Sequence, residues 1–270
     1  MILSNFHTHT SFCDGYDTPE SIVLEAISMG FDTLGFSDHS HTAFDPVRSM
    51  SRENTAKYIK TVNELKEKYR DKIKILCGVE QDLFSDMPTD EYDYVIGAVH
   101  HIIKDGEYIQ IDKSPTALRI AADKYFGGDL YSLAEEYYAN MERLASRSDV
   151  DVMAHFDLVA LFSGRMRDFD ENNKRYKNAA LHAMRRALEN DKIIEINTFP
   201  VRRGFKVYPY PSEFLLKEVL HKKGKILFSS DSHKKNTLDN GFGIAQAYAY
   251  ECGFSVIAID RANDVLKNIE

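Results

Sequence analysis

Short apolar runs alternate with longer amphipathic segments along almost the whole chain. Runs typical of buried strands lie at Ile2–Phe6, Thr33–Phe36, Lys72–Val79, Tyr94–Val99, Val150–Ala154, Ile193–Ile196, Lys225–Phe228 and Ser255–Ile259. Helical spacing of apolar residues is found within Thr18–Gly30, Ser51–Tyr69, Tyr131–Arg147, Asn172–Glu189, Pro211–Lys222 and Gly243–Cys252. Such alternation predicts a parallel sheet, and a sheet of about seven or eight strands is expected to close into a barrel.

Residues that can ionise or bind metals follow the predicted strands directly. They are His7 and His9, Asp38, His39 and His41, Glu80 and Asp82, His100 and His101, His155 and Asp157, Asn197, and Asp231 and His233. In a parallel β/α barrel the C-terminal strand ends form one rim, so these side chains are expected to face one cleft. His7 and His9 are two residues apart on a strand and would point the same way, as two ligands of one metal ion would.

A single histidine at a strand end is more often a structural residue than a ligand. His182 and His221, inside predicted helices, keep that interpretation. The recurrence at many strand ends is different, because burying several ionisable groups together costs on the order of 2–7 kcal/mol for each uncompensated polar group. Metal coordination would offset this cost.

Composition narrows the class of protein. The 270 residues carry a net charge of −8 and their basic residues are scattered, which argues against extended binding to nucleic acid. Three cysteines without close spacing argue against a disulfide framework and favour a reducing, cytoplasmic location. We find no linker, no secretory signal and no apolar run long enough for a membrane span, and expect a single domain over residues 1–270.

Six motifs in order resemble the PHP family, which is named for polymerase and histidinol phosphatase domains. They are HTHT at 7–10, SDHS at 37–40, Glu80 within GVEQD at 78–82, GAVHH at 97–101, MAHFD at 153–157 and SSDSH at 229–233. The resemblance implies an α/β fold, a distorted (β/α)7 TIM-like barrel with a metal cluster at the C-terminal rim of the strands.

The resemblance also implies two or three divalent metal ions. The first would use His7, His9, Glu80 and Asp231, the second His100 and His155 with Glu80 as a bridge, and the third His39, His233 and Asp14. Imidazole and carboxylate ligands suit Zn, Mn or Fe alike. We interpret Cys13 as a structural residue and Asp38 as a residue that orients a ligand.

The chemistry that follows is hydrolysis of a phosphate ester. A hydroxide held between two ions bridged by Glu80 and anchored by Asp231 would attack phosphorus, and no protein nucleophile is needed. His233 is a candidate proton donor to the leaving group, alongside the third metal ion and its water.

Within the family the chain resembles the stand-alone histidinol-phosphate phosphatases of histidine biosynthesis. The segment EINTFPVRRGFKVYPYPSEFL from Glu195 implies that Arg202, or failing that Arg203, clamps phosphate near Asn197. His41 could donate to the same phosphate or face water. A largely helical insertion at about 102–149 could cover the substrate, although we expect most of its aromatic residues to pack a helix onto the barrel.

Two other functions stay open. Another PHP-type phosphoesterase would act on nucleotides or other small phosphate esters, and activity on a substrate panel would distinguish it. A metal-stabilised binding module without activity would show a degraded ligand set, and no ligand position is lost here. The expected partner is a small phosphate ester, with no nucleic acid and no membrane, and the oligomeric state is open.

Overall fold

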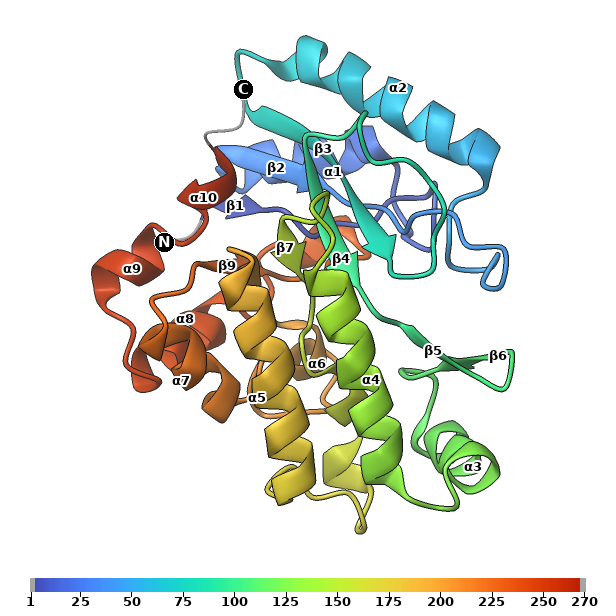
Figure 1. The fold of residues 1–270 in the computed structure, drawn as a ribbon. Coiled ribbons are helices and arrows are strands. Elements are labelled where there is room, and N and C mark those ends of the chain that lie inside the picture. The colour runs from blue at the N-terminus through green and yellow to red at the C-terminus, as the bar shows by residue number, and fades with distance from the viewer. Residues whose placement is uncertain (1–2, 268–270) are drawn as a thin grey trace.

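Seven parallel strands form a barrel in the computed structural model, which describes residues 3–267 (Figure 1). In spatial order they are β1 (Ser4–Asn5), β2 (Thr33–Phe36), β3 (Lys74–Asp82), β4 (Tyr94–Ala98), β7 (Val152–Met153), β8 (Ile193–Asn197) and β9 (Ile226–Ser229). Each strand pairs in parallel with the next. The sequence-based prediction of a β/α barrel is therefore confirmed.

The barrel is nearly closed between β9 and β1. Thr8 and Ser232 form a parallel bridge just beyond the two strands, where the His9 N–H donates to the Ser232 carbonyl at 2.8 Å. Toward the other end, the Asn263 amide donates to the carbonyls of Ser4 and Phe228 at 3.1 and 3.0 Å. Main chain at one end and a side chain at the other thus join the first strand to the last.

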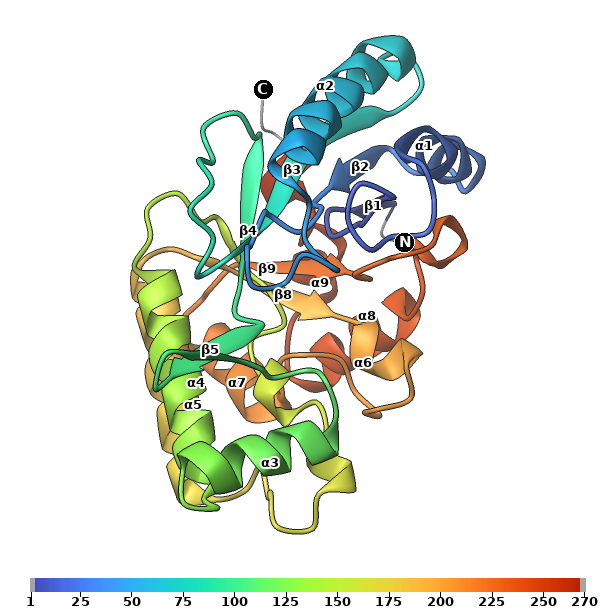
Figure 2. The same cartoon turned by 90° about the vertical axis from the view of Figure 1, so that its right-hand side faces the viewer.

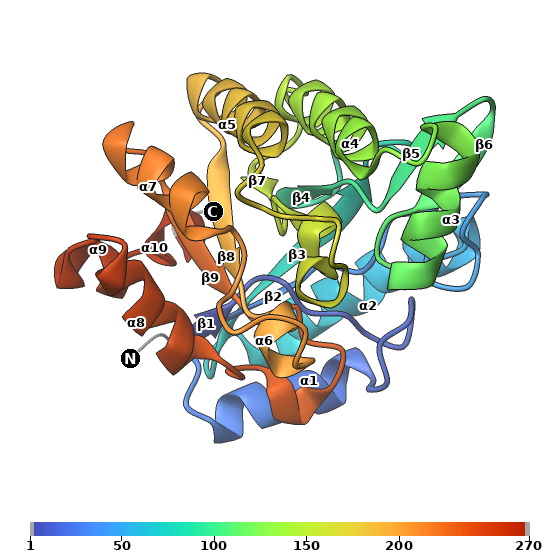
Figure 3. The same cartoon turned by 90° about the horizontal axis from the view of Figure 1, so that it is seen from below.

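Helices surround the strands on the outside (Figure 3). The main ones are α1 (Pro19–Ser28), α2 (Arg52–Tyr69), α4 (Leu130–Ala145), α5 (Lys174–Glu189), α7 (Glu213–His221) and α8 (Phe242–Glu251). The predicted start of α1 is confirmed, because the Thr18 hydroxyl accepts from the Ser21 N–H and Pro19 is the first helical residue. No helix within residues 3–267 has the length and apolar character needed to cross a membrane.

Tyr94 fills the inside of the barrel. Its hydroxyl donates to either the Phe6 or the Phe36 carbonyl, at 2.5 and 2.9 Å, and its ring lies against Gly35 and Gly78. A Cβ at Gly78 would stand 2.3 Å from Tyr94 Cζ, so only glycine leaves room for the ring. The packed interior leaves the C-terminal rim for the polar groups.

The predicted strand at Ser255–Ile259 is wrong. Val256–Asp260 forms helix α9, and the Ser255 hydroxyl caps it by accepting from the Ala258 N–H. Seven strands already complete the barrel, so this apolar run has no free edge to pair with, whereas a helix satisfies its own backbone hydrogen bonds. The first predicted strand begins at Ile2, which lies outside the described residues.

The segment after β4 opens with a hairpin that the sequence analysis did not predict. Strands β5 (His101–Lys104) and β6 (Glu107–Gln110) pair antiparallel, and Asp105 and Gly106 make the turn with φ of 51° and 81°. An Asp-Gly pair is typical of tight hairpin turns, so this hairpin could have been predicted from the sequence. Helix α3 (Pro115–Tyr125) follows, and Figure 2 shows it near the hairpin. In α4, Tyr137, Tyr138 and Met141 are buried, as expected of packing residues.

The remaining elements are short. They are α6 (Phe199–Arg202), α10 (Asp264–Lys267) and the 3-10 turns Leu158–Ala160, Ser163–Arg165 and Lys235–Thr237. Helix α6 directly follows β8 and lies over the strands in Figure 3, so it covers part of the rim.

Candidate metal centre

Glu80, on β3, lies at the centre of a cluster of histidines. Its carboxylate is almost fully buried, and five imidazoles from the ends of four other strands approach it. The nearest nitrogen–oxygen distances are 3.4 Å for His7, 3.6 Å for His9, 2.7 Å for His39, 3.4 Å for His100 and 3.0 Å for His155. The rim of the barrel therefore brings the strand-end histidines to a single carboxylate.

Asp231, directly after β9, adds a second carboxylate to the cluster. Its Oδ1 lies 3.3 Å from His9 Nε2 and 3.8 Å from His7 Nε2. The backbone of Asp231 has a φ of 50°, a left-handed conformation that a short polar residue tolerates better than most. The tight turn there aims the carboxylate back at the end of β1.

A third group lies nearer the surface. Asp14, from the loop after β1, places Oδ1 3.3 Å from His233 Nε2 and 3.7 Å from His39 Nε2. The His233 ring stacks on that of His9 with 4.2 Å between centroids. All nine residues predicted as ligands thus converge.

Three overlapping sets of ligand atoms, which share His9, His39 and Glu80, are each compact enough to hold an ion. The sets, with all atoms within 4.8 Å, are His7, His9 and Glu80; His39, Glu80 and His100; and His9, Asp14, His39 and His233. A fourth set, His9, Cys13 and Asp38, involves the other ring nitrogen of His9, because Cys13 Sγ lies 3.4 Å from Nδ1 while Nε2 faces Glu80.

Buried polar atoms without partners mark the centre of the cluster. His7 Nε2 and His9 Nε2 have no hydrogen-bond partner among the described residues, and Glu80 Oε2 has only the close contact with His39 Nδ1, whose geometry is not that of a hydrogen bond. Leaving such atoms unsatisfied is costly, whereas a divalent cation would satisfy all three at once. Imidazole and carboxylate ligands suit a borderline or hard divalent metal, so the residues fit the metal ions that the sequence implied.

The close packing of carboxylates and imidazoles shifts the pKa values of the site residues. Burial would raise the pKa of Glu80, but His39, His100 and His7 outweigh it and hold that pKa well below its usual range. Burial, together with His233 and His39, lowers the pKa of His9 to about 3. An ionised Glu80 and a neutral His9 are forms that bind metals, whereas nearby carboxylates raise the pKa values of His7, His39 and His155, so these imidazoles would lose protons when metal ions bind.

Glu195, on β8, is a site residue that the sequence analysis did not assign. Its Oε1 lies 2.5 Å from His7 Nδ1, and its Oε2 accepts from the backbone N–H of His155 at 2.7 Å. Burial would raise the pKa of Glu195, but His7 and His155 lower it, so the carboxylate is ionised and His7 Nδ1 donates. Glu195 precedes Asn197 by two residues on a strand, so the two side chains share a face. This spacing could have identified Glu195 as a site residue from the sequence.

Asp38 joins the loops that follow β1 and β2. Its carboxylate accepts from both the backbone N–H and the hydroxyl of Thr10, each at 2.5 Å. Thr10 is the residue after His9, and Asp38 directly precedes His39. Asp38 therefore ties the two ligand-bearing loops together.

A pocket opens onto the metal centre at the rim. This rim pocket is lined by Asp14, His39, Arg48, His100, Asp112, His155, Leu158, Phe199, Tyr210, Asp231 and His233. Arg48 and Asp112 were not singled out in the sequence, because a lone arginine and a lone aspartate in loops carry no spacing signal.

The four predicted substrate-binding residues take different positions. The Arg202 guanidinium donates to the Asp231 carbonyl at 3.2 Å, whereas Arg203 is exposed. Asn197 is fully buried, and its amide donates to Glu195 and Asp231. The His41 ring donates to the Met50 carbonyl at 3.0 Å.

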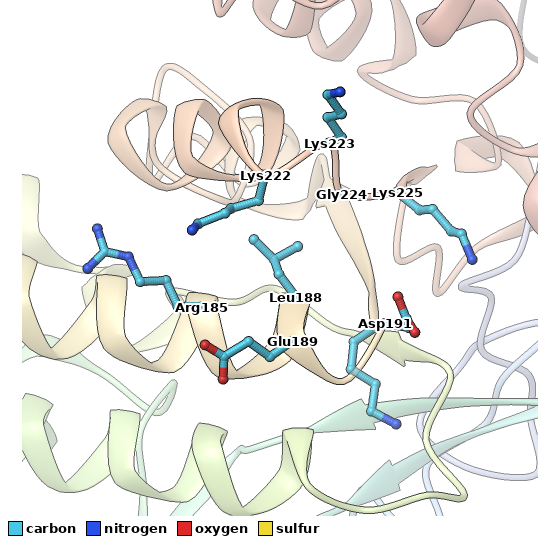
Figure 4. A pocket seen from close by; sticks show the side chains of 9 residues that line it. Arg185, Leu188, Glu189, Asp191, Lys222, Lys223, Gly224 and Lys225 are labelled. Atoms are coloured by element: carbon cyan, nitrogen blue, oxygen red, sulfur yellow. The ribbon is translucent and has the colours of Figure 1, made fainter.

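A second pocket, basic in character, lies at the other end of the barrel between α5 and the start of β9. Its lysines include Lys222, Lys223 and Lys225. Figure 4 shows these side chains pointing in three different directions. They do not converge on a common ligand position, and we regard this face as a solvated surface.

Comparisons with known proteins agree with the geometry. The family model of the PHP domain matches residues 5–199. A Schizosaccharomyces pombe protein named "Probable histidinol-phosphatase" is 28% identical over 97% of this chain and 92% of its own length. The histidinol-phosphatase of Bacillus subtilis is 25% identical over 91% and 96%.

A solved structure shares the fold. The histidinol phosphate phosphatase of Lactococcus lactis, complexed with Zn, L-histidinol and phosphate, superimposes with a TM-score of 0.68 at 22% identity. The match covers 93% of this chain and 94% of that one.

Proposed function

Because the chain belongs to the PHP domain family, we propose that it is a metal-dependent histidinol-phosphatase, which hydrolyses L-histidinol phosphate to L-histidinol and phosphate. The observation that carries the proposal is the buried Glu80 carboxylate, which five imidazoles approach; three of these imidazoles, those of His39, His100 and His155, also line the rim pocket. Relatives named for this activity match the chain along nearly all of its length, which supports this substrate.

We propose that three divalent ions bind. His7, His9, Glu80 and Asp231 would hold the first, His100, His155 and Glu80 the second, and His39, His233 and Asp14 the third. Zn, Mn and Fe all suit these ligands, and Zn is present in the Lactococcus lactis structure. Bound divalent ions lower the pKa of water to near neutrality and neutralise charge on phosphate oxygens.

The protein residues around this centre would position the reactants. Glu195 holds the His7 ring so that its Nε2 faces Glu80, and Asn197 holds Asp231 through one carboxylate oxygen. His233 is a pocket-lining residue with a partly exposed side chain, so it can reach the leaving-group oxygen. As the P–O bond to that oxygen breaks, a proton must reach it to give the neutral alcohol. His233 would supply this proton only while its Nε2 does not hold the third ion, because its Nδ1 donates to the Asp231 carbonyl at 3.1 Å; otherwise water at that ion would supply it.

Arg202 is the proposed phosphate ligand. Its guanidinium reaches the backbone of Asp231, and its Nε is buried without a hydrogen-bond partner among the described residues. A planar donor with an unused N–H suits two phosphate oxygens.

The direct test is release of phosphate from L-histidinol phosphate by the purified protein. p-Nitrophenyl phosphate and a panel of nucleotides serve as comparison substrates, and bound metal is counted on the same sample. We expect a strong preference for L-histidinol phosphate, about three ions per chain, and loss of activity on chelation. A preference for nucleotides would instead support the alternative phosphoesterase, and full activity of Glu80→Gln would overturn the mechanism.

A further inference from the structure

One wall of the rim pocket carries charged residues that do not belong to the metal centre. Arg48 comes from the loop between β2 and α2, and Asp112 follows β6. Leu158, Phe199 and Tyr210 provide apolar and aromatic surface in the same pocket. The pocket therefore has one part lined by proposed metal ligands, one apolar part and one charged part. The proposed mechanism assigns no role to the charged part.

Arg48 is held between two carboxylates. Its Nε donates to Asp45 Oδ2 and its Nη1 donates to Asp112 Oδ2, both at 2.7 Å. All three side chains are about four-fifths buried, with exposed fractions of 22%, 18% and 19%. These bonds join the β2–α2 loop to the insertion beside the metal centre.

The three side chains together carry a net charge of −1, because two carboxylates flank one guanidinium. Asp112 has further capacity, since each carboxylate oxygen accepts about two hydrogen bonds and, within residues 3–267, its Oδ1 receives only the Gln110 amide at 3.0 Å. Arg48 and His100 lower the pKa of Asp112 against the effect of burial, so this carboxylate is ionised.

We propose that Asp112, positioned by Arg48 and supported by Asp45, binds the protonated amine of the substrate's leaving group. This inference rests on the proposed phosphatase function and narrows its substrate class to phosphate monoesters that carry a cationic amine. The phosphate would lie toward the metal centre and Arg202, and the amine toward the anionic wall. A nucleotide has no ammonium group at a comparable place and would gain nothing from Asp112.

The test compares two substrates that differ only in the amine. L-Histidinol phosphate carries it, and 3-(imidazol-4-yl)propyl phosphate lacks it. We expect the wild-type kcat/KM to favour the amine substrate by on the order of 10- to 100-fold, the range for a hydrogen bond to a charged group. In Asp112→Asn, whose side chain is isosteric, this ratio should fall close to one.

Two further variants make the result specific. Asp149 also pairs with an arginine, Arg147, but precedes β7 at the end of the barrel away from the rim, so Asp149→Asn should keep the wild-type ratio. Asp112→Glu keeps the charge and should retain part of the preference. Metal content equal to wild type would show that Asp112→Asn is folded.

The outcomes separate the two proposals. A wild-type ratio retained in Asp112→Asn, or equal wild-type rates on the two substrates, would overturn the role of Asp112 and leave the phosphatase function intact. Failure of the wild-type enzyme to hydrolyse either substrate would overturn both.

Discussion

The Nδ1 atom of His7 lies 2.5 Å from Oε1 of Glu195, and both side chains are completely buried. The two residues are 188 positions apart in sequence. Because Glu195 accepts from Nδ1, the lone pair of Nε2 is left to face Glu80 and the proposed ion.

Glu195→Gln should weaken metal binding. The neutral amide cannot stabilise the donated proton as a carboxylate does, and loss of such an outer partner typically costs 10- to 100-fold in metal affinity or activity. A competition titration with a chromogenic chelator measures this effect. Glu189→Gln, on exposed α5 surface, is the control and should bind metal like the wild type; equal affinity in both variants would contradict the assignment.

Arg202 and its neighbour Arg203 offer a matched pair for the phosphate site. Arg202→Ala should raise KM by about 10-fold or more, because a charge-assisted hydrogen bond contributes about 1.5–3 kcal/mol. Arg203 is exposed, so Arg203→Ala should stay close to wild type. Steady-state kinetics on L-histidinol phosphate decide between them. A raised KM in Arg203→Ala with a wild-type KM in Arg202→Ala would assign phosphate binding to Arg203 instead.

Gly78→Ala should destabilise the barrel. The new Cβ would stand 2.3 Å from Tyr94 Cζ, and the ring cannot move freely because its hydroxyl is bound to main-chain carbonyls. Overpacking of this kind costs about 1–3 kcal/mol or more. Gly243 in α8 has no atom within 4 Å of a built Cβ, so Gly243→Ala is the control. Equal urea midpoints for the two variants would argue against a rigid Tyr94.

Asp129 should contribute a pH-dependent part of the free energy of unfolding. Hydrogen bonding from Arg175 lowers the pKa of Asp129 from 3.8 to about 2. A lowered folded-state pKa stabilises the protein above pH 3.8, and this contribution is lost as the pH falls through about 2. Since the side chain is 35% exposed, solvent screening limits the effect to about 1 kcal/mol or less.

Asp129→Asn isolates this contribution, because asparagine can still cap α4 by accepting from the Tyr131 N–H. Chemical denaturation should show a gap between wild type and variant at pH 6 that narrows by pH 3. A gap that stays constant with pH would assign the difference to packing instead.

The sequence alone determined the architecture and the main residues of the site. Buried strands appear as apolar runs, and the residues that follow them must share one rim once parallel strands close into a barrel. For that reason His7, Glu80, His155 and Asp231 could be placed together before their distances were known. The run at Ser255–Ile259 shows the limit of this approach, because only the completed barrel decided that no strand position remained there.

Only the tertiary structure decided which residues support and surround that site. Glu195 meets His7 across 188 positions, and Arg48 meets Asp112 across 64, between loops with no shared periodicity. Local patterns report how a segment buries its own side chains. A charged pair between two loops depends on how those loops come to lie over the rim, and no single stretch of sequence carries that information.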